Sequence, residues 1–126
     1  MSTKQNTYFI DIDGTIITQD GYTIHEILCD GFDSAVGVLP NVISKFEEWW
    51  EAGHIIILTT GRPESARQMT IEQLSSLGIF CHQLIMGVGS GKRYLINNKS
   101  REGEDRTFAI NLPINKGFLP ETFKNI

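Results

Sequence analysis

The sequence predicts an α/β domain built on a Rossmann-like, doubly wound and mostly parallel sheet. We expect five strands, helices on both faces and a small flap after the first strand, because strand-like and helix-like segments alternate along the chain. The run Ile55–Leu58 lacks polar alternation, which is typical of a strand buried on both faces. The 126 residues suffice for one core, so a single domain is predicted over residues 1–126.

The composition is that of an ordinary globular chain, with 40% hydrophobic and 21% charged residues. The formal net charge of −4 disfavours nucleic acids and anionic membranes as partners. The longest apolar run is too short to cross a bilayer, and the first residues show no signal-peptide pattern. We therefore predict a cytoplasmic protein without a membrane partner.

The first strand is predicted at residues 8–12, where aromatic and β-branched residues precede the turn sequence at residues 13–15. This strand would deliver Asp11 and Asp13 at its carboxyl end. Residues 16–39 combine three glycines with loosely alternating apolar residues, so we assign them to a hairpin or flap.

Two helices are indicated by apolar residues that recur at helical spacing between proline and glycine signals. The first begins after Pro40 and ends at Gly53, and the second begins after Pro63 and ends at Gly78. Residues 55–59 form the second strand, between these helices. Three further strands are predicted at residues 83–86, 93–97 and 107–112.

Polar residues follow these strands at their carboxyl ends, where ligands of open parallel sheets gather. Asp11 and Asp13 end the first strand, Thr60 and Arg62 follow the second, and a cation at Lys92 or Arg93 precedes the fourth. Carboxylates attract a hard cation such as Mg²⁺, whereas hydroxyls, cations and a helix N-terminus favour a phosphate. The pattern predicts a phosphoryl group bound beside a metal ion.

The segment Asp11-Ile12-Asp13-Gly14-Thr15 resembles the first motif of the haloacid dehalogenase superfamily of phosphohydrolases, Asp-x-Asp-Gly-Thr. Thr60-Gly61-Arg62 at the end of the next buried strand is similar to the second motif of that family. A basic residue follows about thirty positions later, as the third motif requires. Together these matches span residues 8 to 112.

The resemblance implies a phosphomonoester hydrolase that acts through an aspartyl-phosphate intermediate. Asp11 would attack the phosphorus, and Asp13 would protonate the leaving oxygen and then activate water. The spacing leaves open which of Lys92, Arg93 and Lys99 is the catalytic cation. The expected phosphate-binding residues are Thr60, Gly61, Arg62, Lys92 and Arg93.

The metal site is where the chain departs from the family pattern. The resemblance implies that Mg²⁺ is held by Asp11, by the backbone carbonyl of Asp13 and by an acidic residue after the fourth strand. That place holds Asn97 and Asn98, which bring no charge, so we take Asn98 as the third ligand and expect weaker metal binding. The alternative is a weakened or inactive phosphoryl-binding or regulatory module.

The chain has no room for the cap domain that commonly shields such sites, so the resemblance is to the small capless type. We expect a small phosphorylated metabolite, such as a sugar phosphate, as the substrate. Nucleic acid is disfavoured by the acidic charge balance. A homo-oligomer would allow a neighbouring subunit to cover the open site.

Overall fold

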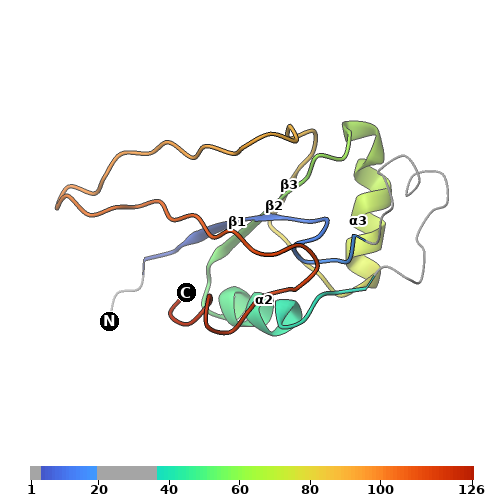
Figure 1. Cartoon of the computed structure of the whole chain (residues 1–126), viewed down its shortest axis with the longest axis horizontal. Coiled ribbons are helices and arrows are strands. Elements are labelled where there is room, and N and C mark those ends of the chain that lie inside the picture. The colour runs from blue at the N-terminus through green and yellow to red at the C-terminus, as the bar shows by residue number, and fades with distance from the viewer. Residues whose placement is uncertain (1–3, 20–36) are drawn as a thin grey trace.

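The computed structural model describes residues 4–19 and 37–126 and shows a small α/β domain (Figure 1). Its sheet has three parallel strands in the order β1-β2-β3, and a helix lies between each pair of consecutive strands. The chain order is β1 (Thr7–Asp11), α2 (Val42–Glu51), β2 (Ile55–Thr59), the 3₁₀ turn η1 (Glu64–Ala66), α3 (Arg67–Ser76) and β3 (Gln83–Ile85).

Helix α2 forms where the proline and glycine signals predicted a helix. Its N-cap residue Asn41 adopts a left-handed conformation with φ 66°, and Gly53 beyond its end has φ 82°. Val42, Phe46 and Trp49 are buried and recur at intervals of four and three residues. The helix therefore presents a continuous apolar stripe to the sheet.

Helix α3 also forms as predicted, and Gly78 with φ 77° follows its end. Its buried stripe, however, is largely polar. Thr70 and Gln73 are buried beside Leu74, whereas Ile71 is 43% exposed. A buried polar side chain needs a hydrogen-bonding partner, so this stripe points to a polar group underneath the helix.

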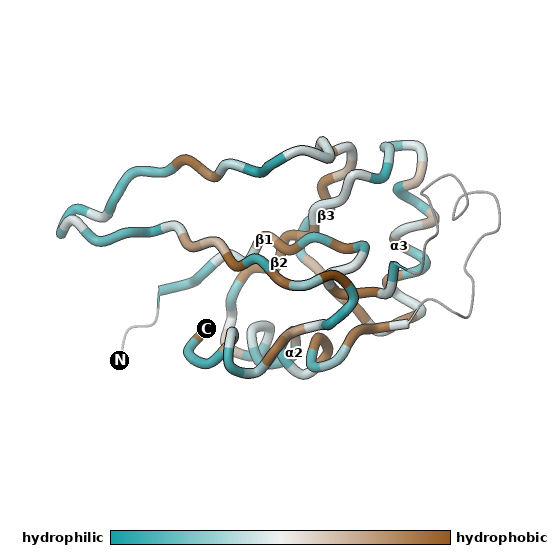
Figure 2. The backbone as a smooth tube through the Cα atoms, in the orientation of Figure 1, coloured by the Kyte–Doolittle hydropathy of each residue, from teal (hydrophilic) through white to brown (hydrophobic). Residues whose placement is uncertain are grey.

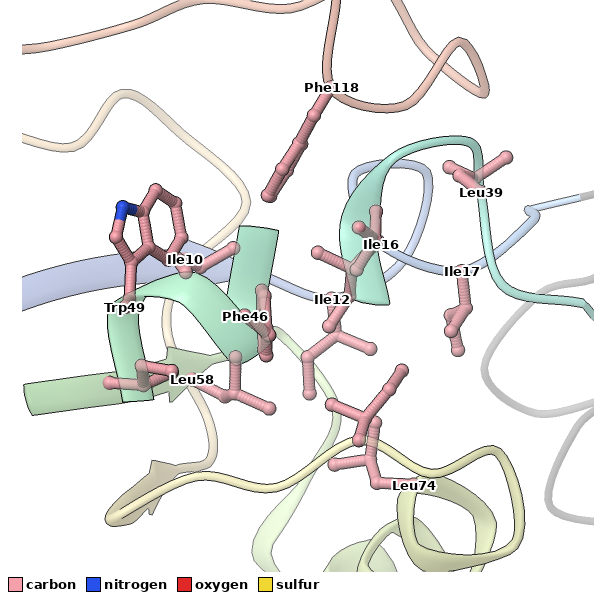
Figure 3. Packing of buried hydrophobic residues seen from close by; sticks show 13 residues of the cluster. Ile10, Ile12, Ile16, Ile17, Leu39, Phe46, Trp49, Leu58, Leu74 and Phe118 are labelled. Atoms are coloured by element: carbon pink, nitrogen blue, oxygen red, sulfur yellow. The ribbon is translucent and has the colours of Figure 1, made fainter. Parts of the chain in front are cut away.

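The core lies against the sheet face formed by Tyr8, Ile10, Ile56 and Leu58. These residues share one face because Tyr8 pairs with Ile56 and Ile10 with Leu58 in the parallel register, and side chains alternate along a strand. Side chains of both helices enter the same cluster. Figure 3 shows this packing around Phe46, Trp49, Leu74 and Phe118.

The predicted five-stranded, doubly wound sheet with helices on both faces is wrong. The described residues form three parallel strands and two α-helices, and the segments predicted as fourth and fifth strands are extended but make no strand pairing. These segments, residues 93–97 and 107–112, project from the sheet (Figures 1 and 2). Their apolar residues cover no core, since Ile96 is 91% and Phe108 is 82% exposed. Most of the predicted flap lies outside the described residues.

The C-terminal segment returns to the body and packs on α2. Phe118 is buried, and its backbone N–H donates to the Pro40 carbonyl at 3.0 Å. Asn41 donates through Nδ2 to the Phe118 carbonyl at 2.9 Å. Within residues 4–19 and 37–126, no helix has the length and apolar character needed to cross a membrane.

Candidate functional site

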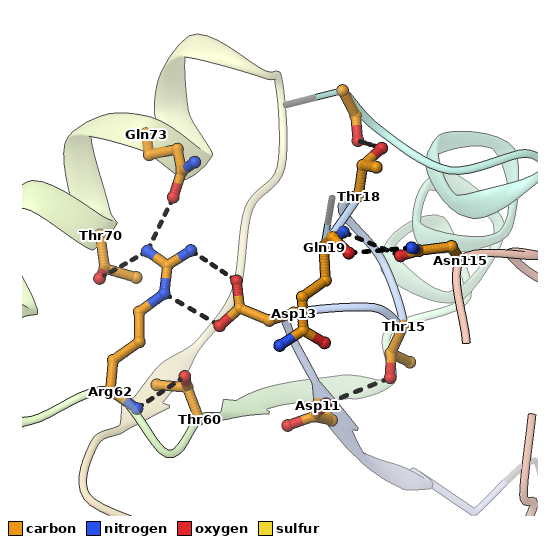
Figure 4. Close-up of polar contacts among 11 residues, drawn as sticks. Asp11, Asp13, Thr15, Thr18, Gln19, Thr60, Arg62, Thr70, Gln73 and Asn115 are labelled. Atoms are coloured by element: carbon orange, nitrogen blue, oxygen red, sulfur yellow. Dashed lines mark hydrogen bonds and ion pairs between the residues drawn. The ribbon is translucent and has the colours of Figure 1, made fainter. Parts of the chain in front are cut away.

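Two aspartates stand at the carboxyl end of β1, as the sequence predicts. After Asp11 the chain turns sharply, and the Ile12 carbonyl accepts from the backbone N–H of Thr15 at 3.2 Å and of Ile16 at 3.0 Å. This turn brings the Thr15 hydroxyl to Oδ2 of Asp11 at 3.2 Å (Figure 4). The Asp11 side chain is 42% exposed, so one carboxylate is accessible to a ligand.

The groups around Asp11 shift the pKa of its carboxyl in opposite directions, and the net shift is upward. Burial raises the pKa of the Asp11 carboxyl above 3.8, and the nearby charge of Asp13 acts in the same direction. The hydrogen bond from Thr15 and the positive charge of Arg93 partly offset this increase in pKa. The Nη2 atom of Arg93 lies 3.9 Å from Oδ1 of Asp11, and half of the Arg93 side chain is exposed.

Asp13 is held by a fully buried arginine. Arg62 Nη2 donates to Oδ1 of Asp13 at 2.7 Å and Nε donates to Oδ2 at 3.0 Å, a bidentate pair (Figure 4). The Arg62 side chain has no exposed surface, and that of Asp13 is 14% exposed. The remaining guanidinium nitrogen, Nη1, donates to Thr70 Oγ1 at 3.0 Å and to Gln73 Oε1 at 2.7 Å.

This network explains the polar stripe of α3, because Thr70 and Gln73 are the partners of the buried guanidinium. Arg62 was predicted as a phosphate ligand from its place in the second motif. In the structure four of its five side-chain N–H groups donate to Asp13, Thr70 and Gln73, and the side chain has no exposed surface. Its chemical effect on a ligand would therefore be exerted through Asp13.

Thr60 lies at the end of β2, as predicted, and is 1% exposed. Its Oγ1 accepts from the Arg62 backbone N–H at 3.1 Å, which leaves the hydroxyl proton available for another acceptor. The loop after β3 packs on this turn, since Val88 N donates to the Thr60 carbonyl at 2.9 Å. A Cβ on Gly61 would come 3.2 Å from the Val88 carbonyl, so this contact favours glycine.

Asn115 is a structural part of the site that the sequence reasoning missed. Its backbone N–H donates to the Gly14 carbonyl at 2.8 Å. Its side chain makes two hydrogen bonds with the backbone of Gln19, at 2.8 and 3.0 Å (Figure 4). The C-terminal segment thereby fixes the turn that carries Asp13. The sequence signal for a turn here was Asn115 followed two residues later by Gly117. Asparagine and glycine both tolerate a left-handed backbone, and Asn115 has φ 62°.

The remaining predicted residues lie on or beside the projecting segment. Lys92 is exposed and Arg93 approaches Asp11. Lys99, the third candidate cation, pairs instead with Asp105 at 3.5 Å. Asn97 and Asn98 are exposed, and each donates through its side-chain amide to the next backbone carbonyl along the chain. The structure thus brings Arg93, but neither asparagine, to Asp11.

The Mg²⁺ site stays a prediction from the motifs, with Asp11, the backbone carbonyl of Asp13 and Asn98 as its ligands. In the described part of the chain, no group of three or more His, Cys, Asp or Glu side chains is placed to hold a metal ion. Arg62 pairs with the Asp13 carboxylate, whereas the motif implies the Asp13 backbone carbonyl as the ligand. The Asn98 side-chain amide donates to the Lys99 carbonyl. Of the three implied ligands, Asp11 supplies the negative charge, and its side chain is 42% exposed.

The comparisons with known proteins identify no relative. No family model, no curated protein and no solved structure matches this chain. The functional argument therefore depends on the chemistry of the site. That chemistry consists of an accessible carboxylate with a hydroxyl and a cation beside it, and a second carboxylate held two residues further along the chain.

Proposed function

We propose that this chain hydrolyses phosphomonoesters with Asp11 as the nucleophile, as the resemblance of its motifs to the haloacid dehalogenase superfamily implies. The observation that supports the proposal is the pairing of an accessible carboxylate with a rigidly held one. Asp11 is 42% exposed beside Arg93, while Asp13 is fixed by a buried bidentate arginine. A structural role alone would not require one exposed and one fixed aspartate at the end of the same strand.

In the first step, a carboxylate oxygen of Asp11 forms a bond to phosphorus while the bond from phosphorus to the ester oxygen breaks. The leaving oxygen takes a proton from a water molecule and departs as the alcohol, and an aspartyl-phosphate remains. In the second step, water attacks the phosphorus, the bond to Asp11 breaks and inorganic phosphate leaves. The positive charge of Arg93 would attract the phosphoryl group and stabilise the developing negative charge.

Asp13 is best suited to the second step. Each of its oxygens accepts one hydrogen bond from Arg62 and keeps a lone pair that can take a proton from the attacking water. Both Asp13 oxygens already accept hydrogen bonds from Arg62, so in this scheme the leaving oxygen takes its proton from water instead.

We propose a small phosphorylated metabolite as the substrate class, since the acidic chain would repel a polyanion. Mg²⁺ is the cofactor proposed from the motif. Asp11, the backbone carbonyl of Asp13 and Asn98 would hold it, and the assay below measures its effect by adding MgCl₂ or EDTA.

The experiment measures phosphate release from a generic aryl phosphate with added MgCl₂ and with added EDTA. We expect release by the wild type and its loss in Asp11→Asn, which keeps the size of the side chain but is a poor nucleophile. Asp105→Asn is the matched control, because Asp105 is a 72% exposed aspartate far along the chain from the site. Equal release by Asp11→Asn and the wild type would refute the proposal, as would the absence of release under both conditions.

A second candidate function is a phosphoryl-binding module without turnover. It is favoured by one observation: in the described residues, no group of three or more His, Cys, Asp or Glu side chains is placed to hold a metal ion. This module would bind inorganic phosphate with dependence on Arg93 but release none from an ester. Calorimetric titration with phosphate, using wild type and Arg93→Gln, therefore separates it from the enzyme when combined with the assay above.

A further inference from the structure

Residues 92–112 form an extended projection, called the arm below, that carries large apolar side chains into solvent (Figures 1 and 2). Every residue from 91 to 111 is exposed except two. The exposed apolar residues include Tyr94 at 79%, Ile96 at 91% and Phe108 at 82%. Exposed apolar residues that cluster in this way mark an interaction surface, because isolated monomers rarely present them to water.

The two limbs of the arm also leave most of their backbone N–H and C=O groups without hydrogen bonds to one another. A turn joins its two limbs, where Ser100 N donates to the Glu104 carbonyl and Gly103 N donates to the Ser100 carbonyl, both at 2.9 Å. The arm lies wholly within the described residues, and beyond this turn no backbone hydrogen bond joins its limbs. Extended limbs with unpaired N–H and C=O groups readily associate with another chain.

The body of the molecule has an apolar groove on α2. It encloses about 410 Å³ and is lined by residues of α2, β2 and the turn after α3. Trp50 is 47% and Phe80 is 64% exposed there, and Glu47 and Glu51 add negative charge to the lining. The groove would therefore suit a segment that combines apolar side chains with cations.

The arm has this combination, and the charges of the chain indicate that a second copy supplies it. Residues 92–112 contain five Lys or Arg and three Asp or Glu, so the arm carries 5 − 3 = +2. The described residues outside the arm contain six Lys or Arg and eight Asp or Glu, so they carry 6 − 8 = −2. Opposite charges on two parts of one chain favour association of the arm of one copy with the body of another.

We propose that two copies of this chain form a dimer by reciprocal docking of each arm in the groove of the other. Tyr94, Ile96 and Phe108 would supply the apolar contacts around Trp50 and Phe80. The arm cations would lie near Glu47 and Glu51. Two identical arm-to-groove contacts related by a two-fold axis close the assembly, so each exposed patch is covered without forming an open filament. Arg93, beside Asp11, lies at the base of the arm, so docking would also restrain that cation.

The test is the mass of the protein in sedimentation experiments. We expect a species of twice the 14.2 kDa chain mass, with a dissociation constant that rises as NaCl is added because the charge attraction is screened. The arm variant Ile96→Ser/Phe108→Ser and the groove variant Glu47→Lys/Glu51→Lys should each weaken the dimer about tenfold or more. Ile114→Ser and Glu72→Lys are matched controls, since Ile114 is 71% exposed outside the arm and Glu72 is an exposed acid on α3.

Mixing the two variants tests the reciprocity of the contact. The arm variant keeps an intact groove and the groove variant keeps an intact arm, so an equimolar mixture should form a mixed dimer through one contact. Each variant alone should dimerise more weakly than the mixture, because both contacts of its dimer carry a substitution. A wild type that stays monomeric at about 0.5 mM would overturn the proposal, since a real interface of this kind should be occupied there. An arm variant with the dissociation constant of the wild type, or a mixture that dimerises no better than the separate variants, would also overturn it.

Discussion

Asp13 and Arg62 form an ion pair whose guanidinium is completely removed from water. A buried charge without a partner carries a desolvation cost, and here that cost is offset by four hydrogen bonds to Asp13, Thr70 and Gln73. The same geometry fixes the Asp13 carboxylate relative to Asp11. At the scale of single residues, the stability of the fold and the chemistry of the proposed site depend on one arginine.

The first prediction is that Arg62→Gln is strongly destabilising. It leaves the Asp13 carboxylate without its cation, and loss of one partner of a buried pair costs about 3–5 kcal/mol. Arg62→Lys keeps the charge but not the bidentate geometry, so an intermediate loss is expected. Chemical denaturation measures both, with Arg67→Gln as the control because the Arg67–Glu64 pair is exposed and such pairs contribute about 1 kcal/mol or less. Equal losses in Arg62→Gln and Arg67→Gln would contradict the role given to Arg62.

The second prediction concerns the pH dependence of stability at Asp11. Its pKa is raised above 3.8 in the folded state, so the folded chain binds a proton more tightly than the unfolded chain. The free energy of unfolding therefore falls as the pH rises from 3.8 through the folded pKa. Asp11→Asn removes this loss and should be more stable than the wild type at pH 7. The gain is expected to be only a few tenths of a kcal/mol, because solvent screens a side chain that is 42% exposed.

Thermal unfolding of both proteins at pH 3 and pH 7 measures the effect. At pH 3 the wild-type carboxyl is largely protonated and resembles the amide, so the two melting temperatures should converge. A difference between the variants that is the same at both pH values would contradict the assignment. Asp105→Asn on the exposed arm should show little change at either pH.

At the scale of elements, the C-terminal segment closes the structure over both α2 and the site turn. Gly117 has φ 77°, and a Cβ there would lie 2.5 Å from the Pro40 carbonyl oxygen. Two residues earlier, Asn115 binds the backbone of Gly14 and Gln19. The close approach of Gly117 to Pro40 therefore helps to place Asn115, whose hydrogen bonds to Gly14 and Gln19 hold the turn after Asp11.

The third prediction follows from this close approach. Gly117→Ala must both adopt a left-handed conformation and displace Pro40, whereas Gly53→Ala has a similar φ of 82° with no atom within 4 Å. We expect Gly53→Ala to lower the free energy of unfolding by about 1–2 kcal/mol, because alanine disfavours a left-handed backbone. Gly117→Ala should lower it clearly more, because the added Cβ also collides with Pro40. Urea unfolding of the two variants compares them directly. Equal costs would show that the segment shifts away from Pro40 without loss.

The elements that the sequence predicted correctly are those with local signals. The helices α2 and α3 lie between proline and glycine residues, and the strands β1 and β2 are short apolar runs. Residues 93–97 and 107–112 carry equally good strand patterns but make no pairing, because pairing depends on distant segments rather than on local preference. The Asp13–Arg62 pair spans 49 positions, and the Asn115–Gln19 pair spans 96. Contacts over such distances in the sequence cannot be recognised from local residue spacing. Asp13 and Arg62 were therefore each singled out in the sequence, but the hydrogen bonds between them and the role of Asn115 were not predicted.

At the scale of the whole molecule, the structure divides into a packed body and an arm that contributes little to it. The core cluster draws on both helices, two strands and Phe118, whereas the arm adds only a partly buried Leu112 at its end. The opposite net charges of the two parts follow the same division. Folding of the body and association through the arm should therefore be separable.

The fourth prediction tests this separation by replacing residues 94–110 with a short Gly-Ser linker. Burial of apolar surface provides most of the stability, so the free energy of unfolding at low protein concentration should change by less than about 1 kcal/mol. Phe118→Ala, which removes a residue only 3% exposed, should cost about 3–5 kcal/mol in the same assay. At high protein concentration the wild type should gain stability relative to the shortened chain, because association stabilises the folded state by mass action. A shortened chain that fails to fold at low concentration would instead show that the arm is part of the folding unit.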